Sequence, residues 1–188
     1  MAHAGEILDN PITGERIIFR ETAADSGGEL LAIDLILAPD GHVPGAHVHP
    51  TQERFDVVSG TMKFRLARKK IIAKAGDTVI VPPGSIHKFA NAGDEPAHVR
   101  VEVRPALKME QLFETTVALA RDGRTNGKGM PKSLDLALFV REYEDEVRVP
   151  FPPAPMVKAV MAPLAWMAKR RGHAERYALP GLRPAPAV

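Results

Sequence analysis

The hydrophobic pattern from Gly14 to about Arg104 is typical of short extended segments. Clusters of Gly, Pro, Asn, Asp and Ser separate these segments, for example at residues 25–28, 39–41 and 82–84. Turn residues at such regular intervals favour an all-β sandwich or barrel over a sheet built from βαβ units. The expected strands cover residues 16–20, 29–37, 47–49, 54–58, 61–67, 78–81, 87–89 and 98–104.

A helical pattern replaces the extended segments after residue 105. Apolar residues from Met109 to Ala120 recur at helical spacing, which predicts an amphipathic helix that ends near Asp122. We therefore expect two parts: a β-domain over residues 1–105 and a helical C-terminal extension over residues 106–188, which packs on the β-domain or on a second subunit.

Two further helices are expected in the extension. The first covers residues 134–147 with Ser133 as its N-cap, and the second covers residues 156–171 with a kink at Pro163. The last helix is apolar and ends in basic residues, so a position on a membrane surface is an alternative to packing, but packing is favoured. Residues 182–186 are expected to be extended or frayed.

Composition and charge narrow the class of protein. The chain has 188 residues, of which 45% are hydrophobic and 26% charged, as expected for one globular domain with an appendage. The 25 basic and 23 acidic side chains are mostly scattered, which argues against nucleic-acid binding. We predict a cytoplasmic protein without a membrane span, because no apolar run reaches about 18 residues and the N-terminus does not resemble a secretory signal.

The chain contains no cysteine. Disulfides, iron–sulfur clusters and thiolate zinc sites are therefore excluded. Any transition-metal site must use imidazole and carboxylate groups, which bind divalent first-row ions.

Two series of residues in the β-region have fixed spacing. His47 and His49 lie two apart on an expected strand, so their side chains project to the same face. Glu53 follows a corner at residues 50–52, and His87 comes from a different strand after a tight turn at residues 82–84. The first series is Gly41, His47, His49, Glu53 and Gly60, and the second is Gly76, Pro82, Gly84, His87 and Asn91.

In residue type and spacing, both series resemble the two motifs of the cupin superfamily. The resemblance covers residues 14–105 and implies an antiparallel jelly-roll β-barrel with a mononuclear metal site. It implies His47, His49, Glu53 and His87 as ligands of one divalent ion per chain, which is Fe, Mn, Ni, Cu or Zn. Glu53 either remains a ligand or moves to take a proton as a catalytic group.

Alternation along the strands predicts an apolar pocket around the ion. Its candidate residues are Phe55, Val57, Met62, Phe64 and Phe89, although most of these are expected to be core. On the last strand we expect the valines at 99, 101 and 103 in the core and the charged residues in water. In the alternative, Arg100 or Glu102 reaches the cavity and holds a polar group of the substrate.

The resemblance implies several classes of function. We favour a metal-dependent dioxygenase, similar to quercetinases, that acts on a small organic substrate. The alternatives are a non-oxidative isomerase, epimerase or lyase, and a non-catalytic module that binds a small molecule. Exposed strand edges and apolar helices also lead us to expect a homodimer.

Overall fold

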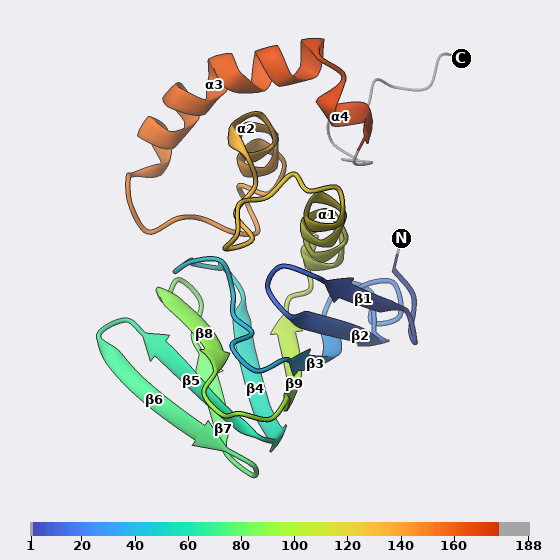
Figure 1. Cartoon of the computed structure of the whole chain (residues 1–188), viewed down its shortest axis with the longest axis vertical. Helices are drawn as coiled ribbons and strands as arrows, with labels where there is room; N and C mark the ends of the chain where they lie inside the picture. The colour runs from blue at the N-terminus through green and yellow to red at the C-terminus, as the bar shows by residue number, and fades with distance from the viewer. Residues whose placement is uncertain (1, 177–188) are drawn as a thin grey trace.

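A computed structural model describes residues 2–176 of the chain. In this part of the chain, nine strands precede four helices (Figure 1). The strands form two antiparallel sheets. The larger has the order β1 (Ile7–Asn10), β2 (Glu15–Glu21), β3 (Leu31–Leu37), β9 (Ala97–Arg104), β4 (Gln52–Ser59) and β7 (Thr78–Val81), and the smaller has the order β6 (Lys69–Lys74), β5 (Thr61–Leu66) and β8 (His87–Asn91).

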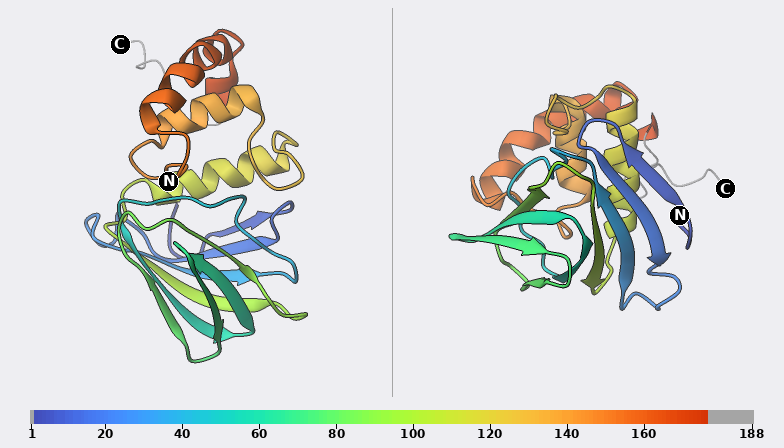
Figure 2. Two further views of the ribbon diagram at one scale, coloured as in Figure 1. Left: turned by 90° about the vertical axis from the view of Figure 1, so that its left-hand side faces the viewer. Right: turned by 60° about the horizontal axis from the view of Figure 1, so that its bottom comes forward.

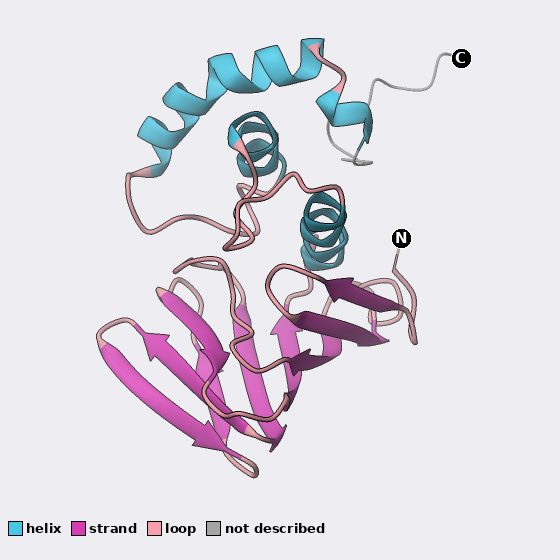
Figure 3. Cartoon of the chain, in the orientation of Figure 1, coloured by secondary structure: helices cyan, strands magenta, loops and turns pink. Residues whose placement is uncertain are grey.

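The prediction of a mainly β protein with antiparallel sheets and a helical tail is confirmed (Figure 3). Closure of the two sheets into a jelly-roll barrel stays a prediction. Two strands were missed: β1 is only four residues long, and β6 begins with the lysines Lys69 and Lys70, which are typical of a loop. Both strands form because a neighbour pairs with them, β2 in one case and β5 in the other.

Residues 47–49 do not form the regular strand that was expected. Instead, His47 pairs with His87 and Val48 pairs with Arg148, each through a single antiparallel bridge. The segment is therefore held from two sides, by β8 and by the helical extension.

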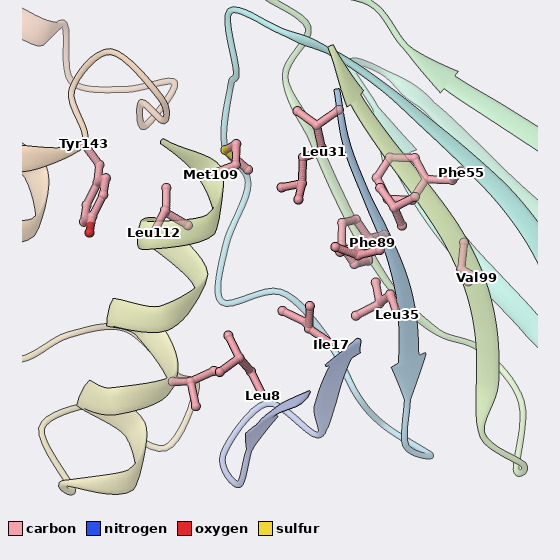
Figure 4. Close-up of a cluster of buried hydrophobic side chains, with 14 of the residues drawn as sticks. Leu8, Ile17, Leu31, Leu35, Phe55, Phe89, Val99, Met109, Leu112 and Tyr143 are labelled. Atoms are coloured by element: carbon pink, nitrogen blue, oxygen red, sulfur yellow. The ribbon is translucent and has the colours of Figure 1, made fainter. Parts of the chain in front are cut away.

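The core lies between the sheets and extends towards the first helix. On β9, Val99, Val101 and Val103 are buried, as expected for one face of a strand that alternates apolar and polar residues. Figure 4 shows Phe55 and Phe89 on the side of the sheets, with Met109 and Leu112 of α1 (Met109–Arg121) facing this side from the helix.

The helices cover one end of the two sheets. Helix α1 lies nearest the strands, α2 (Ser133–Glu142) lies above it, and α3 (Ala154–Arg170) is farthest away (Figure 2). A short α4 (His173–Arg176) follows. In residues 2–176, no helix combines the length and the hydropathy that a membrane span requires.

Two predictions about α2 are wrong. The N-cap is Lys132 rather than Ser133, and no side chain caps the helix. The helix ends at Glu142 instead of residue 147, because the chain turns there and Arg148 pairs with Val48 in the β-region. Helix α3 continues through Pro163, and the predicted extended segment at residues 182–186 lies outside the described residues.

A buried tyrosine joins α1 to the end of α2. The hydroxyl of Tyr143 donates a hydrogen bond to the carbonyl of Gln111 (2.8 Å) and lies 2.7 Å from Thr115 Oγ1. Tyr143 is fully buried, and burial raises the pKa of its hydroxyl above the ordinary value. The contact therefore stays neutral and fixes the two helices relative to each other.

We predict that Tyr143→Phe lowers the free energy of unfolding by about 1 kcal/mol, since it removes a buried hydrogen bond without changing the packing volume. Urea unfolding measures this loss. Thr115→Val provides the matched partner: the double variant should lose less than the sum of the two single losses, because both substitutions break the same contact. Strictly additive losses would show that the two hydroxyls do not interact.

Candidate metal centre

Backbone pairing brings the three motif histidines together. The His47 amide donates to the His87 carbonyl, and the His87 amide donates to the His47 carbonyl, both at 2.9 Å. The amide of Gly84 donates to the His49 carbonyl at 2.8 Å. Gly84 has a φ of +75°, a left-handed conformation that favours glycine, so the turn before β8 can reach back to His49.

The three imidazole rings face one point. Their centroids are 4.3 Å apart for His47 and His87, 4.8 Å for His47 and His49, and 5.6 Å for His49 and His87. Each ring offers one nitrogen, and these ligand atoms lie within 4.8 Å of one another. Three imidazoles at this spacing can hold one metal ion.

Hydrogen bonds set the tautomer of each ring. The Nδ1 atoms lie 2.9 Å from the Gly45 carbonyl for His47, 2.6 Å from the Glu146 carbonyl for His49, and 3.1 Å from the Ser85 carbonyl for His87. A carbonyl oxygen only accepts hydrogen bonds, so we assign the proton to Nδ1 in all three neutral rings. Each Nε2 then carries a free lone pair, as a metal ligand requires.

Glu53 adds a carboxylate to the same point. It lies on the inward face of β4 with Phe55 and Val57, as strand parity predicted. Its Oε2 is 2.7 Å from His87 Nε2, and its Oε1 is 3.8 Å from His49 Nε2. The structure thus places Glu53 beside the three histidines, but its role as a fourth ligand stays a prediction.

The contact between His87 Nε2 and Glu53 Oε2 is the arrangement expected of two atoms that bind the same metal ion. His87 Nε2 and Glu53 Oε2 are buried, and neither has a hydrogen-bond partner of acceptable geometry among the described residues. With the proton of His87 on Nδ1, two lone pairs face each other across 2.7 Å. A proton or a cation must lie between them, so the donor set suits a divalent ion.

Burial and mutual interactions shift the pKa values of the apo site. Burial is the main cause that lowers the pKa of His47 to about 3, with a further contribution from the neighbouring imidazoles. Burial by itself would raise the pKa of Glu53 and lower that of His87. Their mutual contact outweighs it, so the pKa of Glu53 is lowered and that of His87 is raised. His47 is therefore neutral and available as a ligand at physiological pH.

His47, His49 and Glu53 lie at the wall of a cavity of about 320 Å³, and His87 lies behind this wall, in contact with Glu53. Its lining is mainly apolar and comes from both parts of the chain. Its exposed charged members, such as Asp145 and Lys158, lie after α2 and in α3, where the cavity meets the solvent. The sheets contribute Ile17, Ile33, Leu35, Phe55, Phe89 and Val101, and the helices contribute Met109, Leu112, Phe113, Leu136, Phe139 and Val140.

The candidate pocket residues divide into two groups. Phe55 and Phe89 line the cavity, whereas Val57, Met62 and Phe64 are buried behind the lining. Phe64 packs against both lining rings, with centroid distances of 5.2 Å to Phe55 and 5.9 Å to Phe89. It supports the wall of the cavity rather than forming it.

Arg100 and Glu102 lie outside the cavity. Their strand turns its valines inward, so both side chains lie on the outer face of the sheet. Arg100 is 60% exposed and lies 3.8 Å from the carboxylate of Asp34, while Glu102 pairs with Arg104 at 3.3 Å. The structure therefore corrects the alternative in which one of them holds substrate.

Several site residues were missed in the sequence. The carbonyl of Glu146, which fixes His49, belongs to the helical extension, and no motif indicates it. Asn10 and Glu15 add polar groups to the cavity wall. Strand parity could have found Glu15, because it shares the inward face of β2 with Ile17 and Phe19.

Comparisons with known proteins agree with the resemblance of the two motifs to the cupin superfamily. The family profile described as Cupin domain matches residues 34–103, the segment that holds the three histidines and Glu53. The predicted resemblance to the cupin superfamily is therefore confirmed for this segment of the chain. No protein in the curated set matches the chain.

Three solved structures have similar folds. An RmlC-like cupin from Shewanella frigidimarina NCIMB 400 is 18% identical with a TM-score of 0.48, over 58% of this chain and 96% of that chain. KdgF from Halomonas sp. is 16% identical with a TM-score of 0.49, over 56% and 92%. A predicted oxalate decarboxylase from Thermotoga maritima is 20% identical with a TM-score of 0.48, over 54% and 92%.

We predict that His87→Ala abolishes metal binding and leaves the chain folded, because the apolar core does not depend on the ion. Outer partners of metal ligands contribute about 10- to 100-fold to affinity, and loss of a ligand should exceed that. Elemental analysis of purified protein measures the metal content. His42→Ala is the control, since His42 lies outside the three-histidine cluster; equal metal in wild type and His87→Ala would refute the assignment.

The side chain of Glu15 ionises at a higher pH than an ordinary glutamate. Burial is the main cause that raises its pKa from 4.5 to about 7, against opposing effects of Thr13 and His42. The folded chain thus holds this proton more tightly than the unfolded chain. The stabilisation is complete below pH 4.5 and is lost as the pH rises to about 7.

Relative to Glu15→Gln, metal-free wild type should therefore lose up to about 3 kcal/mol of unfolding free energy between these two pH values. Urea unfolding across this range measures the difference. Glu29→Gln, at an exposed acid, should follow the wild type. Parallel profiles for wild type and Glu15→Gln would show that Glu15 ionises normally.

Proposed function

We propose that the protein is a metal-dependent oxidoreductase of the dioxygenase type, which acts on a small, mainly apolar organic molecule. One observation carries the proposal: three imidazoles with free Nε2 lone pairs converge beside the carboxylate of Glu53, and two of them, with Glu53, line a mainly apolar cavity. The four side chains would hold one divalent ion and leave coordination positions open. We also propose that the two sheets close as a cupin jelly-roll barrel around this site.

When bound, such an ion supplies Lewis-acid chemistry and a meeting point for an oxygen-bearing substrate and O₂. His47, His49 and His87 hold it, and the carbonyls of Gly45, Glu146 and Ser85 keep the rings in the required tautomer. These contacts preorganise the site before substrate enters.

Glu53 has a further role in the proposal. Its carboxylate is buried, which by itself would raise its pKa. The neighbouring imidazoles have the opposite and larger effect, so the pKa of Glu53 is lowered. It is therefore ionised at neutral pH and can accept a proton from a hydroxyl group of a substrate bound beside it. A phenol or an enol has both the acidic proton and the apolar body that this cavity fits.

The cavity wall favours this class over a sugar-like substrate. Phe55 and Phe89 lie near the metal end, most of the other lining residues are apolar as well, and Arg100 and Glu102 face away from the cavity. The apolar lining also keeps water from a reactive intermediate.

The test is oxygen uptake by protein reconstituted separately with iron, manganese, nickel and copper, with a panel of aromatic and diketone substrates. We expect uptake that depends on both the substrate and the metal, and its loss in His87→Ala. His42→Ala should keep the activity of the wild type. Detection of an oxygenated product by mass spectrometry would support the proposal.

Two outcomes contradict it. Turnover of the same panel without oxygen would assign the site to the non-oxidative isomerases, epimerases or lyases. Tight binding of a panel compound without any product, in air and under nitrogen, would make the protein a binding module.

The homodimer stays part of the proposal. Its support is a set of exposed apolar side chains on and before α3, which a second subunit would cover. They are Phe151 (81% exposed), Met156 (58%), Val160 (61%) and Trp166 (57%).

A further inference from the structure

We infer that the cavity contains a second recognition site, at Asn10 and Glu15, which binds a hydrogen-bonding group on the far end of an elongated apolar ligand. The inference rests on the proposed function, because it takes the metal centre as the other end of the same cavity. It adds the class of substrate: a molecule with a metal-binding oxygen group at one end, an apolar middle and a hydroxyl group at the other end.

The two residues form a cross-strand pair. Asn10 ends β1 and lies directly opposite Glu15, which begins β2. Side chains of directly opposed residues lie on the same face of a sheet. Both residues line the cavity, so this face is the inward one.

Hydrogen bonds hold both side chains in place and leave groups available for a ligand. The Oδ1 of Asn10 accepts the amides of Ile12 (3.1 Å) and Thr13 (3.2 Å), which directs its amide nitrogen elsewhere. The Oε2 of Glu15 accepts the hydroxyl of Thr13 at 2.6 Å. Among residues 2–176, neither Asn10 Nδ2 nor Glu15 Oε1 has a hydrogen-bond partner in the protein. Neither atom is completely enclosed by the surrounding residues.

One diagonal row of inward-facing residues connects this pair to the metal centre. Glu15 lies beside Ile17, which pairs with Leu35 on β3. Leu35 lies two residues from Ile33, which pairs with Val101 on β9, and Val101 pairs with Phe55 on β4, two residues from Glu53. All of these residues line the cavity.

The row has a carboxyl group at each end and apolar side chains between them, four aliphatic and one aromatic. A ligand that spans it must therefore present apolar surface in the middle and polar groups at its two ends, because an unpaired polar group in the middle would lose its hydration without compensation. A site built to hydrogen-bond a ligand group discriminates strongly against the analogue that lacks it. Glu15 is thus a specificity-determining residue.

The experiment uses zinc-loaded protein and two series of probes, measured by titration calorimetry. The first series is the straight-chain hydroxamic acids from hexano- to dodecanohydroxamic acid, whose head binds zinc. The second series carries an added ω-hydroxyl group. At the chain length that spans the row, we expect the ω-hydroxyl compound to bind at least about tenfold more tightly than its parent.

Variants assign this preference to Glu15. Glu15→Leu should lose the preference and bind the parent compound at least as well as the wild type does. Glu15→Gln, which still donates and accepts hydrogen bonds, should retain it, and Glu29→Leu, at an exposed acid, should not change it. A merely structural role for Glu15 would alter stability without changing this ratio of affinities.

If Glu15→Leu does not fold, a measurement on the wild type alone still tests the second site. An ω-carboxylate probe of the same length should bind more weakly than the ω-hydroxyl probe above neutral pH, because it would face the carboxylate of Glu15. Equal affinities of parent, ω-hydroxyl and ω-carboxylate probes at every chain length would overturn the second site alone. Failure of zinc to improve the binding of any parent hydroxamate would instead overturn the proposed function.

Discussion

The backbone pairing between His47 and His87 is the contact on which the candidate site depends. Two reciprocal hydrogen bonds of 2.9 Å join segments that are distant in the sequence, and they bring the two imidazoles to a centroid distance of 4.3 Å. His49 follows on the same segment, and Glu53 begins the inward face of the next strand. Because the backbone already holds these side chains in place, little conformational entropy is lost when an ion binds.

The helical extension contributes directly to the candidate site. The carbonyl of Glu146 fixes the ring of His49, Arg148 pairs with Val48, and the helices form one wall of the cavity. Residues 1–105 thus contain the candidate ligands, whereas residues from both predicted parts line the cavity. This arrangement places the candidate metal centre at a mainly apolar cavity that meets the solvent at the helical end.

The sequence predicted the metal end of the site better than its substrate end. The spacing of His47, His49 and His87 indicates a common face, because alternation along a strand is a local property. Glu15 and Asn10 join the cavity only through the registers of β1, β2 and β3, and no spacing along the chain reveals those registers. In the fold, β6 was missed for the same reason, since its lysines become part of a strand only when β5 pairs with them.

The central claim is that the Nε2 atoms of the three histidines and the carboxylate of Glu53 face one ion. Anomalous diffraction from crystals of zinc-loaded protein, collected on both sides of the zinc absorption edge, measures this directly. We expect one ordered peak per chain, about 2.0–2.1 Å from each of the three Nε2 atoms and within ligand distance of Glu53. A peak bound through Nδ1, or an ion held away from His87, would contradict it.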